Sequence, residues 1–465
     1  MTLKVALIQA SGTPKEEFGP VSRFATMTPP LGLLYLASQA RLDGHVIEIH
    51  DASLSKIKIK HQVDVVGISA STPTFYHAIE IAAQLKNEFD VPILIGGPHI
   101  SAFPSDLNPS SFDYAILGES EITIRNLLKA IENGSGIKDV QGIAFKDDKG
   151  EIITTKKQPL IPNLDDLPIP AYDLIDLNEY KASPVISKRI PLGSMITSRG
   201  CPYKCVYCDR RIFGEKFRAH SPKRVVEEIA LLKEKHGAKE IRFWDDSFNI
   251  EKQRVMAICE SLINEGLDIE WSCLARANLV DKEMLAMMRK AGCWQISYGL
   301  ESGTQKLLDS IKKGLTLKQG EDAVKWTKAE GIESRGFFML GLPGETKDTL
   351  NDTVSFACKI HLDLAQFYTT IPFPGSELYQ ISQVSGELNV SDWKFFRPNF
   401  PKRQPFIPKG LSEEEILNHQ RKAYRRFYLR PSYILKQVFR MMKPENWIRI
   451  KRIIKANHSQ HQTNQ

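Results

Sequence analysis

Three cysteines stand close together in the middle of the chain, at Cys201, Cys205 and Cys208. Their spacing lets one tight loop turn all three sulfurs toward a single polynuclear centre. Thiolates are soft ligands that suit iron–sulfur clusters or zinc. A cluster of four irons normally takes four cysteines, so a local set of three leaves one iron open to bind and reduce a small molecule. A zinc site would need a fourth ligand, for which His220 is the nearest candidate.

The stretch CPYKCVYC, residues 201–208, resembles the CxxxCxxC signature of the radical SAM superfamily. The resemblance implies a [4Fe-4S] cluster on these cysteines, with S-adenosylmethionine (SAM) bound to the fourth iron through its amino and carboxylate groups. It also implies that reduction of SAM releases a 5′-deoxyadenosyl radical, and that Tyr207 lies at the SAM site. The protein around such a cofactor supplies binding, orientation and exclusion of water. Incidental buried cysteines and a zinc site are the alternatives.

The chain around this motif alternates strands and helices. Six such repeats from Gly193 onward suit a partial (β/α)6 barrel of the TIM type, in which reacting groups lie at the C-terminal ends of the strands. The cysteine loop follows the first strand, as this rule requires. The predicted strands are 194–198, 240–244, 270–275, 294–300, 334–340 and 365–371, and the predicted helices include 222–236, 252–265, 282–291, 317–330 and 347–360.

The ends of the other barrel strands are polar, and the resemblance implies roles for them at the SAM site. Asp245 or Asp246 would hold the SAM ammonium group in place of the Gly-Gly-Glu motif of the family, which this sequence lacks. Arg276 would grip the SAM carboxylate and Glu301 the ribose hydroxyls. Further candidates beside the adenosine are Gly341, Pro343 and Ile371. Each charged residue also has a scaffold interpretation, as a helix cap or as an Arg276–Glu301 ion pair.

The first 150 residues predict a second α/β unit. Apolar runs indicate strands over 4–9, 46–50, 63–69, 92–97 and 113–117, with helical segments such as 31–42 and 76–88 between them. This alternation predicts a doubly wound, Rossmann-like parallel sheet, whose ligands bind at the carboxyl ends of the strands. Those ends are rich in Gly, Ser and Thr, so the backbone can approach a large ligand closely.

Together with the cysteine motif, this half resembles the cobalamin-binding domain fused to radical SAM enzymes, through residues 29–37 (PPLGLLYLA), 96–99 (GGPH) and 118–121 (GESE). The resemblance implies a cobalamin site formed by Ser11, Gly12, Ser69, Ser71, Thr72, Gly97, Pro98, His99, Gly118 and Glu119. Cobalamin domains of the methionine-synthase type carry Asp-x-His-x-x-Gly after the first strand, where the His ligates cobalt. Residues 9–14 read QASGTP, so no histidine of this loop is expected on cobalt. A flavodoxin-like domain that only packs is the alternative, with His99 as a hydrogen-bonded loop histidine.

Four parts are expected along the chain. A cobalamin-binding-like domain spans 1–140, and a hairpin with a proline-rich linker spans 141–192. The radical SAM barrel spans 193–385 and a helical basic region spans 386–465. The hairpin turns at residues 147–150, and the prolines after it favour an extended strap.

Composition fits a globular protein of the cytoplasm. With 465 residues the chain is long enough for two or three domains, and 42% hydrophobic and 25% charged residues are ordinary values. No stretch approaches the roughly 20 apolar residues that span a bilayer, and the N-terminus predicts a first strand instead of a signal peptide. The four cysteines outside the motif lie singly, which indicates free buried thiols in a reducing compartment.

Positive charge is concentrated at the C-terminal end. Residues 402–465 carry 15 Lys and Arg against 4 Asp and Glu, so the rest of the chain is slightly acidic although the total is +7. Aromatic and aliphatic residues are interspersed with these charges. The preferred interpretation is a helical cap on the barrel. The alternative is an interfacial segment that makes peripheral contact with the inner surface of an anionic membrane.

The resemblance implies an enzyme. The first hypothesis is a cobalamin-dependent radical SAM methyltransferase that methylates an unactivated carbon of a small or lipophilic substrate through methylcobalamin. The same cofactors could instead cyclise or rearrange a substrate without methyl transfer. A hypothesis from another class is a non-catalytic cobalamin or redox sensor with a structural cluster. The expected partners are a small-molecule substrate and an electron donor such as flavodoxin or ferredoxin, and no sequence-specific nucleic acid.

Overall fold

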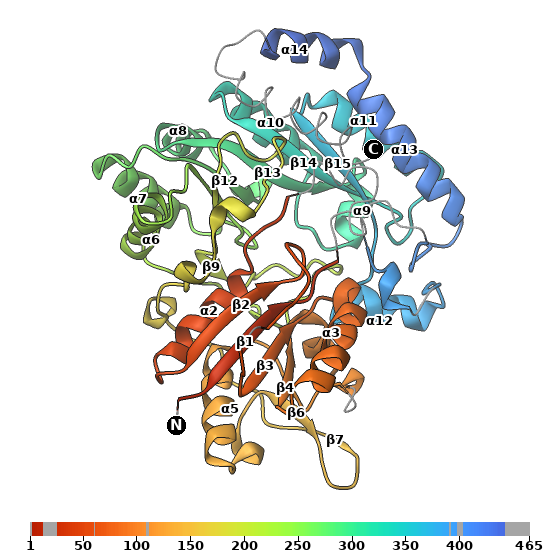
Figure 1. Cartoon of the computed structure of the whole chain (residues 1–465). Coiled ribbons are helices and arrows are strands. Elements are labelled where there is room, and N and C mark those ends of the chain that lie inside the picture. Colours follow the sequence, from red (N-terminus) through yellow and green to blue (C-terminus); the bar gives the residue numbers. More distant parts are fainter. Residues whose placement is uncertain are drawn as a thin grey trace, which may run out of the picture.

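The computed structural model describes residues 2–12, 26–59, 61–107, 111–389, 392–397 and 403–441. Figure 1 shows two sheets, one built from the N-terminal third of the chain and one from the middle, each flanked by helices. This arrangement confirms the predicted α/β class.

The strands of the first sheet are β1 (Lys4–Gln9), β2 (Val46–Asp51), β3 (Val65–Ser69), β4 (Ile93–Gly96), β5 (Tyr114–Ile116), β6 (Ile143–Lys146) and β7 (Ile152–Thr154). Its helices are α2 (Leu31–Arg41), α3 (Phe75–Glu88), α4 (Pro98–Ala102) and α5 (Glu121–Asn133).

The first sheet has the strand order β2-β1-β3-β4-β5-β6-β7, with β1 to β5 parallel. Its inner strands are buried on both faces, which explains their continuous apolar sequences. On β1, Ala6 and Ile8 pack toward α3, whereas Val5 and Leu7 pack toward α2 and α5. From β1 the chain continues to β2 on one side and then to β3 on the other, so the order of strands changes direction between β1 and β3. Ligands of doubly wound sheets bind outside such a point.

The hairpin at residues 140–155 forms as predicted, but it belongs to the first sheet. Strand β6 pairs antiparallel with β5, and β7 pairs antiparallel with β6. The first sheet therefore extends to Thr154, beyond the position at which the sequence placed the start of the linker. The reason is that pairing with β5 covers an edge that would otherwise expose its backbone groups.

The second sheet consists of β8 (Leu192–Met195), β11 (Glu240–Phe243), β12 (Glu270–Ala275), β13 (Cys293–Glu301), β14 (Glu333–Leu340) and β15 (Leu364–Thr369). Outside it lie α6 (Pro222–Glu234), α7 (Lys252–Asn264), α8 (Lys282–Lys290), α9 (Gln305–Ser310), α10 (Leu317–Ala329) and α11 (Lys347–Lys359). All six strands run parallel in the order β15-β14-β13-β12-β11-β8, which is the open barrel that the six predicted repeats require. A short ribbon of β9 (Ser198–Arg199) and β10 (Arg218–Ala219) follows β8.

The proline-rich linker packs against both sheets. Ile161, Leu164 and Leu167 form a small apolar cluster with Tyr35 of α2. The buried Tyr172 donates its hydroxyl hydrogen to the Ser194 carbonyl of β8 (2.9 Å) or to the Glu228 carboxylate of α6 (2.8 Å). The linker therefore helps to fix the two sheets relative to each other.

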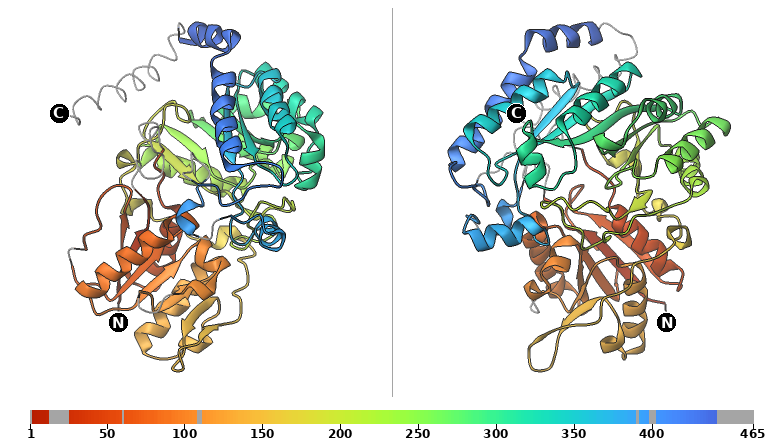
Figure 2. Two further views of the ribbon diagram at one scale, coloured as in Figure 1. Left: turned by 90° about the vertical axis from the view of Figure 1, so that its right-hand side faces the viewer. Right: turned by 180° about the vertical axis from the view of Figure 1, so that it is seen from behind.

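The C-terminal region contains α12 (Glu377–Ser385), α13 (Glu413–Tyr428) and α14 (Pro431–Met441). Helix α13 lies along the open edge of the second sheet, as Figure 2 shows from two sides. Gln420 donates to the Phe367 carbonyl of β15 (2.8 Å), and Tyr428 donates to the Ala365 carbonyl (2.8 Å). Helix α13 is thus the predicted cap on the barrel, while the part of the basic tail after residue 441 lies outside the described residues. In the described ranges, no helix is long and apolar enough to cross a membrane.

Candidate active site

The cysteine loop follows β9, in the short ribbon next to the second sheet. Gly200 makes the turn, because its φ is +83° and a Cβ atom there would lie 2.3 Å from the carbonyl oxygen of Lys216. Backbone hydrogen bonds hold the loop farther on. The Val206 N–H donates to the Ile311 carbonyl (3.1 Å), and the Val206 carbonyl accepts from Leu378 (2.8 Å). The loop is therefore anchored to α9 and α12 as well as to the sheet.

The three thiols of this loop differ in exposure. Cys205 is buried, Cys201 is half-buried and Cys208 is exposed. Nowhere in the described part of the chain do three His, Cys, Asp or Glu side chains gather as ligands of one metal ion would. A polynuclear cluster binds each thiolate through a different iron, so it does not require the three thiols to share one ion.

His220, the predicted fourth ligand of a zinc site, is engaged elsewhere. It is buried, with Nδ1 3.2 Å from the Asp165 carboxylate and Nε2 3.5 Å from the Tyr35 hydroxyl. Burial lowers the pKa of His220 to about 4. The histidine belongs to the contact between the linker and the first domain, so the zinc interpretation lacks its fourth ligand.

Arg276 lies beside the cysteine loop, after β12. Its Nη1 atom is 3.8 Å from the Cys205 sulfur, and its guanidinium stacks on the Tyr203 ring at 3.5 Å. It also donates to the Lys313 carbonyl. Arg276 therefore places a positive charge directly beside the cysteine loop.

The two aspartates after β11 have different surroundings. Asp245 is buried and accepts hydrogen bonds from the Thr197 N–H (2.7 Å), the Thr197 hydroxyl (2.6 Å) and the Ser198 hydroxyl (2.6 Å). It ties the end of β11 to the chain that enters the cysteine loop. Asp246 is exposed. Burial of Cys201 raises the pKa of its thiol, and the negative charge of Asp246 raises it further. Asp246 is therefore the aspartate that faces the site.

Tyr207, Glu301 and Lys313 form a polar group beside the loop. The Glu301 carboxylate accepts from the Tyr207 hydroxyl (3.0 Å) and from the Lys313 ammonium group (2.7 Å). Glu301 has a φ of +58°, and the pairing of β13 with β14 shifts between Gly299 and Glu301. A non-glycine residue with positive φ costs energy and is concentrated at functional sites. Burial, and then the charge of Glu301, raise the pKa of Tyr207 well above its usual value.

The turn after β14 is closed by Glu345. Its buried carboxylate accepts from the N–H groups of Gly341 (2.5 Å) and Leu342 (2.8 Å), and its second oxygen has no partner among the described residues. Burial raises the pKa of Glu345 to about 7. Pro343 lies inside this turn and is half-buried. Ile371, after β15, packs with Tyr379 and Phe396 in a small buried cluster.

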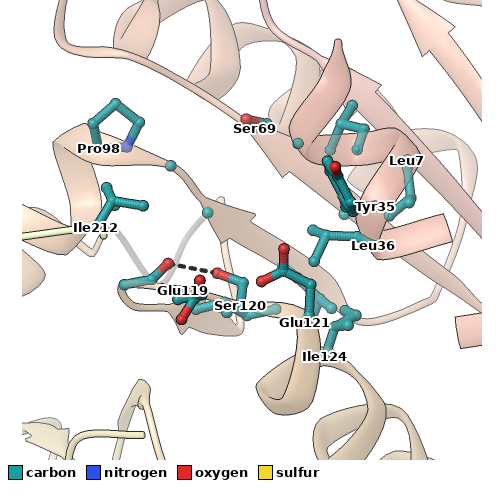
Figure 3. A pocket seen from close by; sticks show the side chains of 18 of the residues that line it. Leu7, Tyr35, Leu36, Ser69, Pro98, Glu119, Ser120, Glu121, Ile124 and Ile212 are labelled. Carbon is teal, nitrogen blue, oxygen red and sulfur yellow. Dashed lines mark hydrogen bonds between the residues drawn. The ribbon is translucent and has the colours of Figure 1, made fainter. Parts of the chain in front are cut away.

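The carboxyl edge of the first sheet encloses a cavity of about 210 Å³, drawn in Figure 3. Most of its wall is apolar and comes from β1, α2, α5 and the ends of β3, β4 and β5. Arg199, Ile212 and Phe213 of the second domain also line it, so the cavity lies at the boundary between the domains. The predicted cobalamin residues in this wall are Ser69, Gly97, Pro98, Gly118 and Glu119.

Gly97 forms the tightest part of this wall. Its φ is +107°, and a Cβ atom there would lie 2.4 Å from the Ala70 carbonyl oxygen. Gly118 also has a positive φ, of +74°, and the Ser120 hydroxyl donates to its carbonyl (2.9 Å). Only glycine fits these backbone conformations without strain, and their bare backbone leaves room for a ligand.

The other predicted cobalamin residues lie apart from this cavity. Ser11 and Gly12 line a smaller hollow of about 190 Å³ beside residues 26–30. Ser71 and Thr72 form the turn before α3, where the Ser71 and Thr74 hydroxyls lie 3.1 Å apart. The structure therefore does not bring all ten candidates together.

His99 is the clearest departure from the predicted cobalamin set. It is fully buried, with its ring nitrogens 3.3 Å from the Thr72 hydroxyl and 3.2 Å from the Asp106 carboxylate. Its ring also packs against Phe75 (4.1 Å) and Trp393 (5.1 Å). His99 therefore holds the C-terminal region against the first domain, as the hydrogen-bonded alternative predicted.

Glu119 joins the two domains through buried ion pairs. Its carboxylate lies 2.7 Å from the Arg199 guanidinium and 2.8 Å from that of Arg218, and it accepts from the Ile161 N–H (2.9 Å). Arg199 also pairs with Glu121 (2.6 Å). Because Arg199 stands two residues before the first cysteine, this network connects the wall of the cavity to the cysteine loop.

Sequence reasoning missed Lys313, Arg199 and Arg218 as parts of the site. Lys313 follows another lysine in a loop and looks like a solvated charge. The two arginines find their partners 80 and 99 residues away, and no local spacing marks such pairs. The position of Arg199 directly before the cysteine motif was the one available signal.

The fold and this site agree with known protein families. A model of the radical SAM superfamily matches residues 195–357, and a model of the B12 binding domain matches residues 20–128. The chain therefore belongs to the cobalamin-binding radical SAM enzymes, whose cofactors are a [4Fe-4S] cluster, SAM and cobalamin.

Individual relatives support this membership. The uncharacterized methyltransferase PH0819 of Pyrococcus horikoshii is 36% identical over 426 residues, covering 89% of this chain and 91% of that protein. The anaerobic magnesium-protoporphyrin IX monomethyl ester cyclase of Rubrivivax gelatinosus is 28% identical, covering 87% of this chain and 75% of the cyclase. The solved structure of the methyltransferase TsrM from Kitasatospora setae, with cobalamin and a [4Fe-4S] cluster bound, shares the fold with a TM-score of 0.70 at 16% identity, covering 93% of this chain and 90% of TsrM.

Proposed function

We propose that this enzyme transfers a methyl group to an unactivated carbon atom of a small substrate. The observation that carries the proposal is the position of Arg199, which lines the cavity of the first sheet and stands two residues before the cysteine loop. Both cofactor sites thereby meet at one domain boundary. The name of the relative PH0819 supports methyl transfer as the reaction.

Three side chains would hold SAM beside the cluster. Asp246 is exposed and negative, which suits the SAM ammonium group, and Arg276 lies beside Cys205, where it suits the carboxylate. Glu301, oriented by Tyr207 and Lys313, has a second carboxylate oxygen for the ribose hydroxyls. When bound, the cluster supplies the electron that cleaves SAM, and cobalamin supplies the methyl group.

The cavity of the first sheet fits part of a cobalamin. Its apolar wall suits the flat benzimidazole of the cofactor tail, and Gly97 and Gly118 let the backbone approach the ligand closely. None of the described residues that line it is a histidine. We therefore expect cobalt without a histidine ligand from this domain.

The alternative reaction is a cyclisation without methyl transfer, which the name of the cyclase relative supports. The two reactions leave different products from SAM. Methyl transfer forms S-adenosylhomocysteine as well as 5′-deoxyadenosine, whereas cyclisation forms 5′-deoxyadenosine alone.

The test uses anaerobically reconstituted enzyme, a reductant and SAM with a trideuterated methyl group. A small-metabolite extract of the source organism supplies the substrate. We expect both SAM products, and a metabolite that has gained the trideuterated methyl group by mass spectrometry. Formation of 5′-deoxyadenosine alone would favour the cyclase, and no cleavage of SAM at all would favour the sensor.

Two expected partners, an electron donor and a membrane surface, remain predictions. A flavodoxin or ferredoxin would deliver the electron to the cluster. Peripheral membrane contact would involve α14, which exposes Ile434, Leu435, Val438 and Phe439. Binding of the protein to vesicles of anionic lipid, compared with the variant Phe439→Ser, measures this contact.

A further inference from the structure

The strands of the second sheet present two different faces. On β11, Ile241 and Phe243 belong to the apolar core beneath the outer helices, so Arg242 points to the inside of the barrel. On β14, Phe338 and Leu340 belong to the same core, so Arg335 also points inside. Both arginines are nevertheless almost completely buried, with 2% and 7% of their surface exposed.

Much of the rest of the inner face is polar or aromatic. A barrel interior that serves only for packing is filled with bulky branched apolar residues. Here the residues that alternate with the apolar core positions include Ser194, Trp244, Ser272, Ser297, Phe337 and Tyr368. The Ser297 hydroxyl is buried without a partner among the described residues. Such side chains offer hydrogen-bonding and aromatic groups to a ligand inside the barrel.

Among the described residues, the two inner arginines contact uncharged side chains. Arg242 lies 3.5 Å from the Ser272 hydroxyl and 4.7 Å from the Trp244 ring. Arg335 donates to the Gln366 side chain and stacks on Phe337 at 5.0 Å. The Nε group of each arginine has no acceptor.

The charges of these arginines are not neutralised by a paired carboxylate within the described ranges. Burial, and then the positive charge of Arg335, lower the pKa of Arg242 to about 10. Both side chains point into the barrel, although two strands separate β11 from β14. Two buried like charges without counterions destabilise a fold, so their presence requires a compensating function.

We infer that the barrel interior binds an anionic oxygen group of the substrate, either a carboxylate or a phosphoryl group, between Arg242 and Arg335. Trp244, Phe337 and Tyr368 would contact the apolar part of the same molecule. This inference rests on the proposed function and names the substrate class for its site.

The carboxylate of SAM is not the anion in question. Arg242 precedes Asp245 by three residues, which places it about 10 Å deeper in the barrel than the strand end. Arg276 already lies at the strand ends, 3.8 Å from Cys205. Arg242 and Arg335 are therefore available to bind the substrate.

The first test measures binding by calorimetry, with benzoate, phenyl phosphate and the neutral benzamide as probes of the reconstituted holoenzyme. We expect benzoate or phenyl phosphate to bind at least about tenfold more tightly than benzamide. The tighter of the two anions identifies the group. In Arg242→Met and Arg335→Met, the preference should fall below about twofold, while the exposed Arg189→Met keeps it.

The second test measures the melting temperature of the same proteins without a probe. Because an unpaired buried charge is removed, Arg335→Met should melt about 2 °C or more above the wild type. Equal binding of charged and neutral probes, no binding of either anion, or a lower melting temperature in both inner variants would overturn the inference. None of these readouts requires turnover, so they stand apart from the test of methyl transfer.

Discussion

Single side chains at the mouth of the barrel are the candidates for binding SAM. Glu301 has a strained backbone conformation and binds two polar partners, Tyr207 and Lys313, through Oε1, while Oε2 has no hydrogen bond among the described residues. A buried carboxylate with a free oxygen beside a cysteine loop can bind hydroxyl groups of a cofactor. The strain is consistent with a position that the site requires.

We therefore predict that Glu301→Gln weakens SAM binding. Loss of one hydrogen bond to a charged group costs about 1.5–3 kcal/mol, so the dissociation constant for SAM should rise about tenfold or more. Equilibrium dialysis with labelled SAM on the reconstituted protein measures this, and iron content is the control. Unchanged SAM affinity together with lower stability would instead assign Glu301 to the scaffold.

A second prediction concerns Glu345 and the pH dependence of stability. Its folded pKa of about 7 lies above the ordinary value of 4.5, so the folded state binds a proton that the unfolded state releases in this range. Its stabilising contribution is complete below pH 4.5 and disappears as the pH rises through 7. Between pH 5 and pH 8 the free energy of unfolding should fall less in Glu345→Gln than in the wild type, by about 2–3 kcal/mol. Urea unfolding at the two pH values measures this, and identical pH profiles would contradict it.

At the scale of elements, helix α13 closes the open edge of the second sheet. Its Phe427 is fully buried in the barrel core, and its Tyr428 donates to a carbonyl of β15. An edge strand left uncovered would expose unpaired backbone groups. The cap is therefore part of the barrel, although it follows the last predicted barrel unit by more than forty residues.

Removal of the buried ring of this cap should destabilise the protein strongly. We expect Phe427→Ala to lower the free energy of unfolding by about 3–5 kcal/mol, because it leaves a cavity in the core. The matched control is Phe439→Ala on α14, whose side chain is 62% exposed and which should change stability by less than about 0.5 kcal/mol. Equal effects of the two substitutions would show that α13 does not cap the barrel.

Much of this element structure was predictable from sequence. The strands and helices for which the sequence predicted bounds fall within about three residues of them, because long apolar runs and amphipathic periods dominate these elements. The pairing of β6 with β5 was not predictable, since it depends on a long-range contact. The same limit applies to His99, whose motif suggested a ligand but whose partners Asp106 and Trp393 come from other segments.

At the scale of the whole molecule, one buried network links the two domains. Glu119 of the first sheet pairs with Arg199 and Arg218 of the second domain, and Arg199 leads into the cysteine loop. Because all three side chains are buried, loss of one partner leaves an uncompensated charge. The network thus fixes the position of the cavity relative to the cysteine loop.

We predict that Glu119→Gln lowers the free energy of unfolding by about 3–5 kcal/mol. Chemical denaturation of the reconstituted protein measures this, with the exposed Glu265→Gln as the control, which should resemble the wild type. A Glu119 variant as stable as that control would mean that the ion pairs do not hold the domains together.

The most direct measurement of the central claim is the metal content of the protein, produced anaerobically with hydroxocobalamin. The structure predicts about four iron atoms and about one cobalt atom per chain. Cys205→Ala should lose the iron and keep the cobalt, because the two cofactors bind to different domains. Iron without cobalt would remove cobalamin from the mechanism, and zinc in place of iron would contradict the account as a whole.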